Sequence, residues 1–141
     1  MKHLSQIMTK EPAYLTDQET VRRAAELMAD LDVGELPICD GRRLVGVVTD
    51  RDITVRCTAK GVAPEKASVR EAMSEHPVWC YEDDSVEDAR SKMENNGIRR
   101  VIVVDRDKQL VGVVSLGDVA VKAGGGGDTL ASVSQPARPA R

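Results

Sequence analysis

The sequence predicts an α/β (α+β) fold built from two tandem repeats, each with the element order β-α-β-β-α. Three observations lead to this prediction. The chain repeats itself at a spacing of about 65 residues. In each copy, a stretch with helical hydrophobic spacing precedes two aliphatic stretches of strand length. The 141 residues suffice for one compact domain, or for two very small repeats that share a core.

The composition argues against several functional classes. The chain is 41% apolar and 30% charged, which is typical of a soluble globular protein. Its formal net charge of −3 argues against nucleic-acid binding, which needs a basic field. No apolar run approaches the roughly 18 residues of a membrane span, and the N-terminus has no apolar region of a secretory signal. Because Tyr14, Trp79 and Tyr81 are the only aromatic residues, the core must be aliphatic.

The internal repeat is the strongest signal in the sequence. A shift of 65 residues aligns the two halves, and one inserted residue in a turn changes the shift to 66. A five-residue block is then identical in both copies, so an internal duplication explains the pattern. The aligned residues include Met8 with Met73, Pro12 with Pro77, Val21 with Val86, Ala24 with Ala89, Met28 with Met93, and residues 44–48 with 110–114.

The order of elements is the same in both repeats. A short extended piece, at residues 12–15 and 77–81, is followed by a helix at residues 21–31 and 86–95. Thr20 and Ser85 are the predicted N-caps, and Ser85 with Asp88 has the spacing of a capping box. Gly97 stands where the second of these helices should end.

Two strands follow each helix, at residues 35–39 and 44–49 in the first repeat and at 100–104 and 110–115 in the second. Both pairs are joined by polar turns. Because the strands are nearly continuous in Val, Ile and Leu, we expect them to be buried on both faces. A further helix is predicted after Thr49 and after Ser115.

These elements predict where the domains begin and end. The first repeat covers residues 1–58, a linker covers 59–68, and the second repeat covers 69–123. Ser68 is positioned to cap a short turn that reaches Met73. Residues 124–141 begin with four glycines and have almost nothing apolar to bury, so we expect a disordered tail.

Cysteine and histidine are too sparse to suggest catalysis or a metal site. Cys39, Cys57 and Cys80 show no C-x-x-C spacing, which is typical of a reduced, cytoplasmic set of thiols. His3 and His76 have no partners at zinc-site spacing. No nucleophile with a base can be assigned, so the sequence predicts a protein that is not an enzyme and requires no cofactor.

The repeats resemble the CBS domain over residues 4–123. The closing segments 46–53 (GVVTDRDI) and 112–119 (GVVSLGDV) resemble the closing motif of that family, and the opening segments 7–12 and 72–77 resemble its opening motif. The chain looks like a stand-alone bacterial CBS-pair protein, similar to the hypoxic-response type. The resemblance implies two units packed about a pseudo-twofold axis with a cleft on each side.

The resemblance also implies a function. Such pairs typically bind AMP, ADP or ATP, and sometimes S-adenosylmethionine or NAD, and act as regulatory modules, usually as homodimers. The chain is therefore expected to act in signal transduction as a ligand sensor with an effector protein that the sequence does not identify. No nucleic acid or membrane partner is expected.

The candidate site residues lie where a strand meets a helix. In the family, the residues that match Asp52 and Asp118 hold the ribose, and those that match Thr49 and Ser115 lie near phosphate. The chemistry is suitable, because an ionised carboxylate accepts from both ribose hydroxyls and a helix N-terminus favours phosphate. The same spacing is also a capping box, which closes a helix end without any ligand. Both interpretations are open from the sequence.

The remaining candidates surround these junctions. Tyr14 and Trp79 occupy equivalent positions in the opening strands, where they either stack on a base or pack ordinarily. Arg99 and Arg100 suit a phosphate, or form a solvated pair or salt bridges to nearby acids. The first repeat has Gly34 and Glu35 there, with Arg51 as partial compensation, so unequal sites are expected. The full predicted set is Tyr14, Thr49, Arg51, Asp52, Val78, Trp79, Ile98, Arg99, Arg100, Ser115 and Asp118.

Two functional hypotheses follow. In the first, binding of an adenosine-containing ligand changes the orientation of the repeats or the dimer contact, and a partner responds to that change. In the second, the chain is a structural or interaction protein that keeps the fold and binds no nucleotide. Glu35 and the capping-box interpretation of Asp52 and Asp118 favour the second hypothesis.

Overall fold

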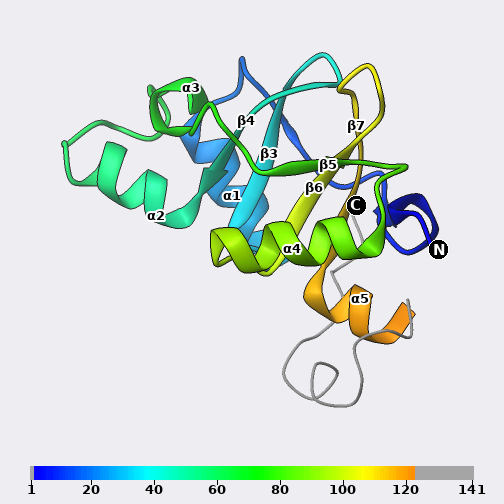
Figure 1. Ribbon diagram of the computed structural model, residues 1–141. Helices are drawn as coiled ribbons and strands as arrows, with labels where there is room; N and C mark the ends of the chain where they lie inside the picture. The colour runs from blue at the N-terminus through cyan, green and yellow to red at the C-terminus, as the bar shows by residue number, and fades with distance from the viewer. Residues whose placement is uncertain (1, 123–141) are drawn as a thin grey trace. The chain divides into compact units, whose positions relative to one another are not determined.

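Two separate β-sheets organise the chain in the computed structural model, which describes residues 2–122 (Figure 1). A four-stranded sheet has the order β1 (Thr9–Lys10), β7 (Leu110–Ser115), β6 (Arg100–Val104), β5 (Trp79–Tyr81). A three-stranded sheet has the order β2 (Leu15–Thr16), β3 (Glu35–Asp40), β4 (Arg43–Thr49). The pairs β2–β3 and β5–β6 are parallel, whereas β1–β7, β3–β4 and β6–β7 are antiparallel. The predicted mixed fold is therefore confirmed.

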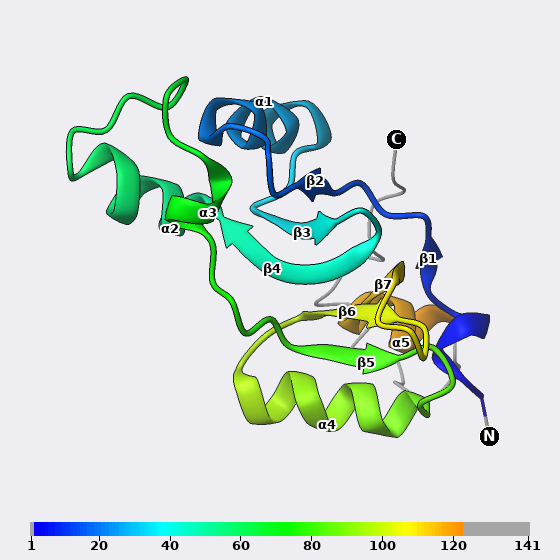
Figure 2. The same ribbon diagram turned by 90° about the horizontal axis from the view of Figure 1, so that it is seen from above.

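Each parallel pair is connected by a long helix with its own caps. Helix α1 (Val21–Leu31) connects β2 to β3, and α4 (Val86–Asn96) connects β5 to β6 and lies along them (Figure 2). The Thr20 side chain accepts from the N–H of Arg23, and Ser85 forms the predicted capping box with Asp88. Gly97 ends α4 in the left-handed conformation. The predicted caps and helices are confirmed.

Several short helices complete the element order. Helix α2 (Asp50–Ile53) follows β4 and continues as the π-helical turn η2 (Thr54–Thr58), while α5 (Leu116–Lys122) follows β7. Helix α3 (Val69–Ala72) is capped by Ser68 as predicted, and a 3-10 turn, η1 (Leu4–Gln6), lies near the N-terminus. Within the described residues, none of the helices is long and apolar enough to span a membrane. The predicted tail, residues 124–141, lies outside the described residues.

The strands are not all buried on both faces, so that prediction needs a correction. The aliphatic residues of β3 and β6 are buried, as expected. Strands β4 and β7 instead alternate, because Val45, Val47, Val111 and Val113 are only partly buried. An unbroken apolar run does not distinguish a fully buried strand from one with a half-covered outer face.

The compact units do not coincide with the sequence repeats. One unit, here the first-repeat unit, consists of residues 13–77, and the other, the second-repeat unit, joins residues 2–12 to 78–122. Each opening segment therefore packs with the sheet of the other repeat. The predicted linker, residues 59–68, belongs to the first-repeat unit, where Ala67 is buried and its carbonyl accepts from the N–H of Val21 at 2.9 Å.

In the second-repeat unit, the opening segment is held by backbone and side chain together. The N–H groups of Leu4 and Ser5 donate to the carbonyls of Asp84 (3.0 Å) and Glu82 (2.9 Å). Leu4 and Ile7 are buried in a cluster formed with residues of β5, β6, β7, α4 and α5. Burying apolar side chains of this size stabilises a fold by about 1.5–3 kcal/mol each.

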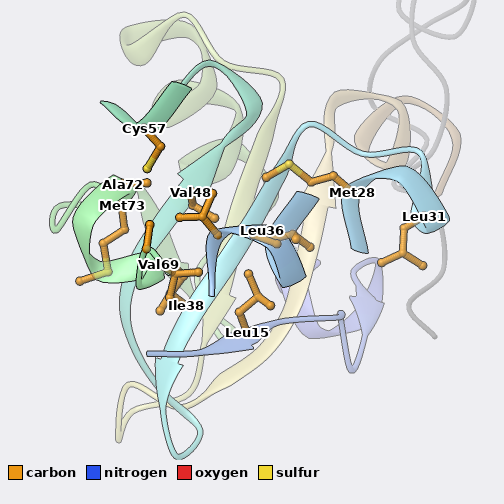
Figure 3. Packing of buried hydrophobic residues seen from close by; sticks show 13 residues of the cluster. Leu15, Met28, Leu31, Leu36, Ile38, Val48, Cys57, Val69, Ala72 and Met73 are labelled. Atoms are coloured by element: carbon orange, nitrogen blue, oxygen red, sulfur yellow. The ribbon is translucent and has the colours of Figure 1, made fainter. Parts of the chain in front are cut away.

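In the first-repeat unit, the segment that opens the second repeat has the equivalent position. Val69, Ala72 and Met73 are buried in one cluster with Ile38 and Val48 (Figure 3). The bridge between Val47 and Ser74 has bonds of 3.0 and 2.8 Å, and it occupies the place that β1 has on β7. The two units are therefore built in the same way, with opening segments exchanged.

An ion pair ties this segment to its unit and predicts acid sensitivity. The guanidinium of Arg70 donates to the carboxylate of Asp17, whose side chain is 8% exposed against 49% for Arg70. That hydrogen bond lowers the pKa of Asp17 below its ordinary 3.8, against the opposing effect of burial. A carboxyl group with a depressed pKa contributes stability that is present above its unfolded pKa and lost as the pH falls through the folded one.

We therefore expect wild type to be more stable than Asp17→Asn near neutral pH, and this advantage to decrease as the pH falls below the pKa of unfolded Asp17 toward the lower pKa of the folded state. Urea unfolding of both proteins at about pH 7, 4 and 3 measures the difference between their free energies of unfolding. Glu26→Gln removes an exposed partner of Arg22 and serves as the control, because exposed pairs contribute little. An advantage over Asp17→Asn that persists unchanged at about pH 3 contradicts the prediction.

Candidate functional site

The first-repeat unit positions Thr49 and Asp52 at the junction of β4 and α2. Thr49 ends β4 and caps α2, so its side chain accepts from the N–H of Asp52 at 3.0 Å. In return, the Asp52 carboxylate accepts from the N–H of Thr49 at 3.0 Å. The Asp52 side chain is 18% exposed, and its other oxygen lies 3.8 Å from the Arg56 guanidinium. The pair forms a complete capping box, and its carboxylate remains partly open to solvent.

The second-repeat unit has the same arrangement, more deeply buried, at the junction of β7 and α5. The N–H of Asp118 donates to the Ser115 hydroxyl at 3.0 Å, and the N–H of Ser115 donates to the Asp118 carboxylate at 2.9 Å. Both residues are buried, Asp118 completely. A ligand would therefore reach this carboxylate only if the capping interaction opened.

Two arginines lie next to this second junction. Arg100 begins β6 directly opposite Ser115 in the β6–β7 ladder. The carbonyl of Arg99 accepts from the N–H of Leu116 at 2.9 Å, which fixes the chain just before β6 against the start of α5. Both arginines are exposed, and Ile98 packs against the unit's core. The register therefore places the backbone of both arginines beside the N-terminal end of α5, and guanidinium groups and helix N-termini both favour anions.

The first-repeat junction has the opposite charge at the same register. Glu35 lies opposite Thr49 in the β3–β4 ladder, and the N–H of Asp50 donates to the carbonyl of Gly34 at 3.0 Å. Space is tight there, because a Cβ on Gly34 would lie 3.2 Å from the Asp50 carboxylate. Arg51 is exposed, and its N–H donates to the same carboxylate at 2.8 Å. Glu35 is expected to weaken binding of a phosphate at this junction.

The aromatic residues of β5 have cationic neighbours that the sequence analysis missed. The rings of Trp79 and Tyr81 meet edge to face, with centroids 4.9 Å apart. Lys92 of α4 and Lys108 of the β6–β7 turn place their Nζ atoms 5.3 and 5.6 Å from the Trp79 ring. The Arg106 guanidinium lies 4.0 Å from the Tyr81 ring, within cation–π range. Only the fold brings these residues together, so no local motif could have indicated them.

The two equivalent aromatic positions differ in structure. Trp79 begins β5 and pairs with Ile102 of β6, and Val78 precedes it half-buried. Tyr14 precedes β2, outside the ladder, and is 37% exposed. The residue aligned with Ile102 is Pro37, which has no N–H for a ladder hydrogen bond, and this accounts for the shorter strand.

The cysteines behave as small apolar residues. Cys39, Cys57 and Cys80 are all free and buried. Burial raises the pKa of Cys39 to about 12 and that of Cys80 to about 11, and it raises the pKa of Cys57 as well. Thiols with such pKa values are poor nucleophiles and poor metal ligands at neutral pH. Among residues 2–122 there is no group of three or more His, Cys, Asp or Glu residues that could hold a metal ion.

The candidate residues thus divide between the units. The first-repeat unit contains Tyr14, Thr49, Arg51 and Asp52, and the second-repeat unit contains Val78, Trp79, Ile98, Arg99, Arg100, Ser115 and Asp118. In each unit, the junction between the last strand and the helix that directly follows it is joined to the chain just before the preceding strand, by the bonds from Asp50 and Leu116.

Sequence and structure comparisons identify the class to which this architecture belongs. A model of the CBS domain matches residues 4–57 and 69–123, so the chain belongs to the CBS-domain family as a tandem pair. The CBS domain-containing protein YhcV of Bacillus subtilis is 39% identical over 121 residues, which cover 86% of this chain and 85% of that protein. Hypoxic response protein 1 of Mycobacterium tuberculosis is 35% identical over 115 residues, or 81% and 80% of the two chains.

Solved structures agree with this assignment. Hypoxic Response Protein I, crystallised with two coordinated zinc ions, matches with a TM-score of 0.77 at 34% identity, over 85% of this chain and 98% of that chain. The CBS domain protein PAE2072 from Pyrobaculum aerophilum, complexed with AMP, has a TM-score of 0.73 at 29% identity, over 94% and 100%. The CBS pair of protein MJ0100, with 5′-methylthioadenosine and S-adenosyl-L-methionine, has a TM-score of 0.68 at 28% identity, over 84% and 97%. The predicted family and its hypoxic-response likeness are confirmed.

Proposed function

We propose that the chain is a non-catalytic regulatory module that binds an adenosine-containing ligand, with AMP, ADP or ATP favoured over S-adenosylmethionine or NAD. The observation that carries the proposal is the second-repeat junction, where Arg100 lies opposite Ser115 at the start of α5. Two relatives of the same fold were crystallised with AMP or with methylthioadenosine and S-adenosylmethionine. Stand-alone CBS-pair proteins are typically regulatory rather than catalytic.

Each group has a role in the proposed complex. The carboxylates of Asp52 and Asp118 accept hydrogen bonds from the ribose hydroxyls in place of the N–H groups that they now cap. The hydroxyls of Thr49 and Ser115 then turn toward phosphate, because capping no longer holds them. Such an exchange costs one helix cap, about 1 kcal/mol, which the ligand contacts must exceed.

The second-repeat site is proposed as the stronger one for a phosphorylated ligand. Arg99 and Arg100 supply donors in a planar fork that suits phosphate, and Trp79 and Val78 form an apolar wall beside the base. Glu35 opposes an anion in the first-repeat site, and Arg51 compensates in part. Tyr14 and Ile98 complete the apolar contacts of the two sites.

Regulation requires that the ligand distinguish two states. A ligand changes an equilibrium only by the difference between its affinities for the two conformations. We propose that the two states differ in the relative orientation of the repeats or in a homodimer contact, and that an effector protein recognises the difference.

A second candidate function is that of a structural or interaction protein that binds no nucleotide. The specific observation that favours it is that both junctions are already closed by capping boxes, with Asp118 completely buried. In this case the repeated geometry of the helix ends serves stability alone.

A thermal-shift titration with AMP, ADP, ATP, NAD and S-adenosylmethionine tests the proposal. A ligand that binds only the folded state at about 100 times its Kd adds roughly 2.7 kcal/mol of stability. We expect an adenine nucleotide to raise the midpoint of wild type, and Asp118→Ala to abolish the rise more completely than Asp52→Ala.

The matched control is Asp88→Ala, which removes the carboxylate of an equivalent capping box at the N-terminus of α4, which is not one of the two candidate junctions. It lowers basal stability in the same way but should leave the ligand-induced shift unchanged. If no ligand shifts the wild-type midpoint at millimolar concentration, the nucleotide proposal fails and the structural function is favoured. If only Asp52→Ala abolishes the shift, the first-repeat site is the functional one.

A further inference from the structure

A strained residue lies where the chain passes from one compact unit to the other. Glu11 has a φ of 49°, in the left-handed region that residues with a side chain disfavour. It also precedes Pro12, and a residue before proline prefers an extended conformation. The first-repeat unit begins at residue 13, directly after these two residues.

The aligned position in the second repeat shows that this strain is not a property of the opening motif. His76 precedes Pro77, as Glu11 precedes Pro12, yet it is not among the residues with positive φ in the part of the chain that the structure describes. Two other non-glycine residues have positive φ there. Asp32 ends α1, and Lys108 lies in the β6–β7 turn, so both sit inside a unit.

The segment before Glu11 forms β-ladder and backbone contacts with residues far along the chain. In addition to the bonds of Leu4 and Ser5, Thr9 pairs with Val113 and Lys10 with Gly112. The N–H of Glu11 donates to the carbonyl of Val111 at 3.2 Å. All these partners belong to residues 78–122, and none belongs to the first-repeat unit, residues 13–77. A second copy of the chain offers the same partners.

We propose that residues 2–10 exchange between two copies of this chain, with Glu11 and Pro12 as the hinge. Exchange keeps every contact of the segment, because each copy receives the segment of the other, and changes only the hinge. An extended hinge relieves the strain at Glu11 and satisfies the preference that Pro12 imposes. Strain in a short hinge is a recognised driving force for such swapping. The resulting dimer is independent of any ligand.

Disulfide trapping distinguishes exchange from other kinds of association. One chain carries Thr9→Cys and a second carries Val113→Cys, and the two are mixed at high concentration and oxidised mildly. Paired residues of antiparallel strands have Cα atoms about 4.5–5.5 Å apart, within disulfide range. The three native thiols are buried and do not compete. A chain that carries both substitutions should form the bond internally and verifies the geometry.

We expect a disulfide-linked heterodimer from the mixture, and no such product when Val47→Cys replaces Val113→Cys. Val47 is the aligned residue of the other sheet and pairs with Ser74 instead. Glu11→Gly removes the backbone strain at position 11 in the two monomers, because glycine adopts a positive φ readily. The monomers are then more stable relative to the dimer, so the dimer dissociation constant should rise about tenfold or more. His76→Gly and Lys108→Gly should leave it unchanged, since neither lies at the strained hinge.

Three results would overturn the proposal. One is the absence of a heterodimer at the highest concentration tested. Another is an equal yield with Val47→Cys, which would indicate random collision. The last is a heterodimer whose yield is insensitive to Glu11→Gly, which would separate exchange from the strained hinge.

Discussion

Replacing Leu4 by alanine is expected to lower the free energy of unfolding by about 2–5 kcal/mol. Leu4 is completely buried, and it packs with Cys80, Ala89, Met93 and Val101. The substitution leaves a cavity, because the surrounding residues relax only partly to fill it. The effect should fall on the second-repeat unit, although Leu4 belongs to the first repeat by sequence.

Segment-resolved hydrogen exchange measures where the loss falls. Leu4→Ala should accelerate exchange in residues 100–115, and the fluorescence of Trp79, in the same unit, should report earlier unfolding. Leu15→Ala is the matched control, because Leu15 is equally buried but belongs to the first-repeat unit. It should accelerate exchange in residues 35–49.

The opposite pattern would mean that the sequence repeats are themselves the stability units. In that pattern, Leu4→Ala accelerates hydrogen exchange more in residues 35–49 than in residues 100–115. That result would contradict the packing of residues 2–12 with the sheet of the second repeat. Equal acceleration in both regions by both variants would show instead that the units open together.

Local elements could be predicted because their signals are local. The periodicity of Ala24 and Met28, the caps Thr20 and Ser85, and the glycine at 97 each act within one or two turns, and the structure has them where predicted. Strand bounds in the second repeat were likewise predictable from an unbroken aliphatic run between polar turns.

Within one chain, each opening segment packs on the sheet of the other repeat, and this could not be predicted from local signals. Met8 and Met73 are aligned in the repeat, and both opening segments have the same pattern, so either sheet could accept either segment. Which sheet an opening segment joins depends on the path of the folded chain, and a short stretch of sequence does not determine that path. The half-covered faces of β4 and β7 have the same origin, because burial of a face depends on what packs against it.

The candidate site was predictable in position but not in state. Thr49 with Asp52, and Ser115 with Asp118, lie at strand–helix junctions as predicted. Their spacing alone could not separate a cap from a ligand contact, since both use the same atoms. Pairing register was also required to place Arg100 opposite Ser115 and Glu35 opposite Thr49.

Adding a methyl group at the two equivalent glycines should have unequal effects. A Cβ on Gly46 of β4 would lie 2.8 Å from both the Met73 sulfur and the Ser74 carbonyl oxygen. A Cβ on Gly112 of β7 would meet the Met8 sulfur most closely, then Met8 Cγ at 2.8 Å and the Thr9 carbonyl oxygen at 3.0 Å. Both glycines are therefore required by close approach of an opening segment rather than by backbone conformation.

Gly46→Ala is expected to cost about 1–3 kcal/mol, because the Ser74 oxygen belongs to a backbone bridge that must move. Gly112→Ala should cost less, since the Met8 side chain is flexible and only half-buried. Double-mutant cycles measured by urea unfolding separate the two cases.

With Met8→Ala in the background, the penalty of Gly112→Ala should largely vanish, because the remaining neighbour at 3.0 Å needs only a small shift. With Met73→Ala in the background, the penalty of Gly46→Ala should persist, because the bridge to Val47 still holds the Ser74 oxygen in place. Rescue of Gly46→Ala by Met73→Ala would show that the methionine, and not the backbone, excludes the methyl group. In that case a methionine side chain would be the obstacle at both glycines, and the backbone bridge of Ser74 would make no difference to the cost of the substitution.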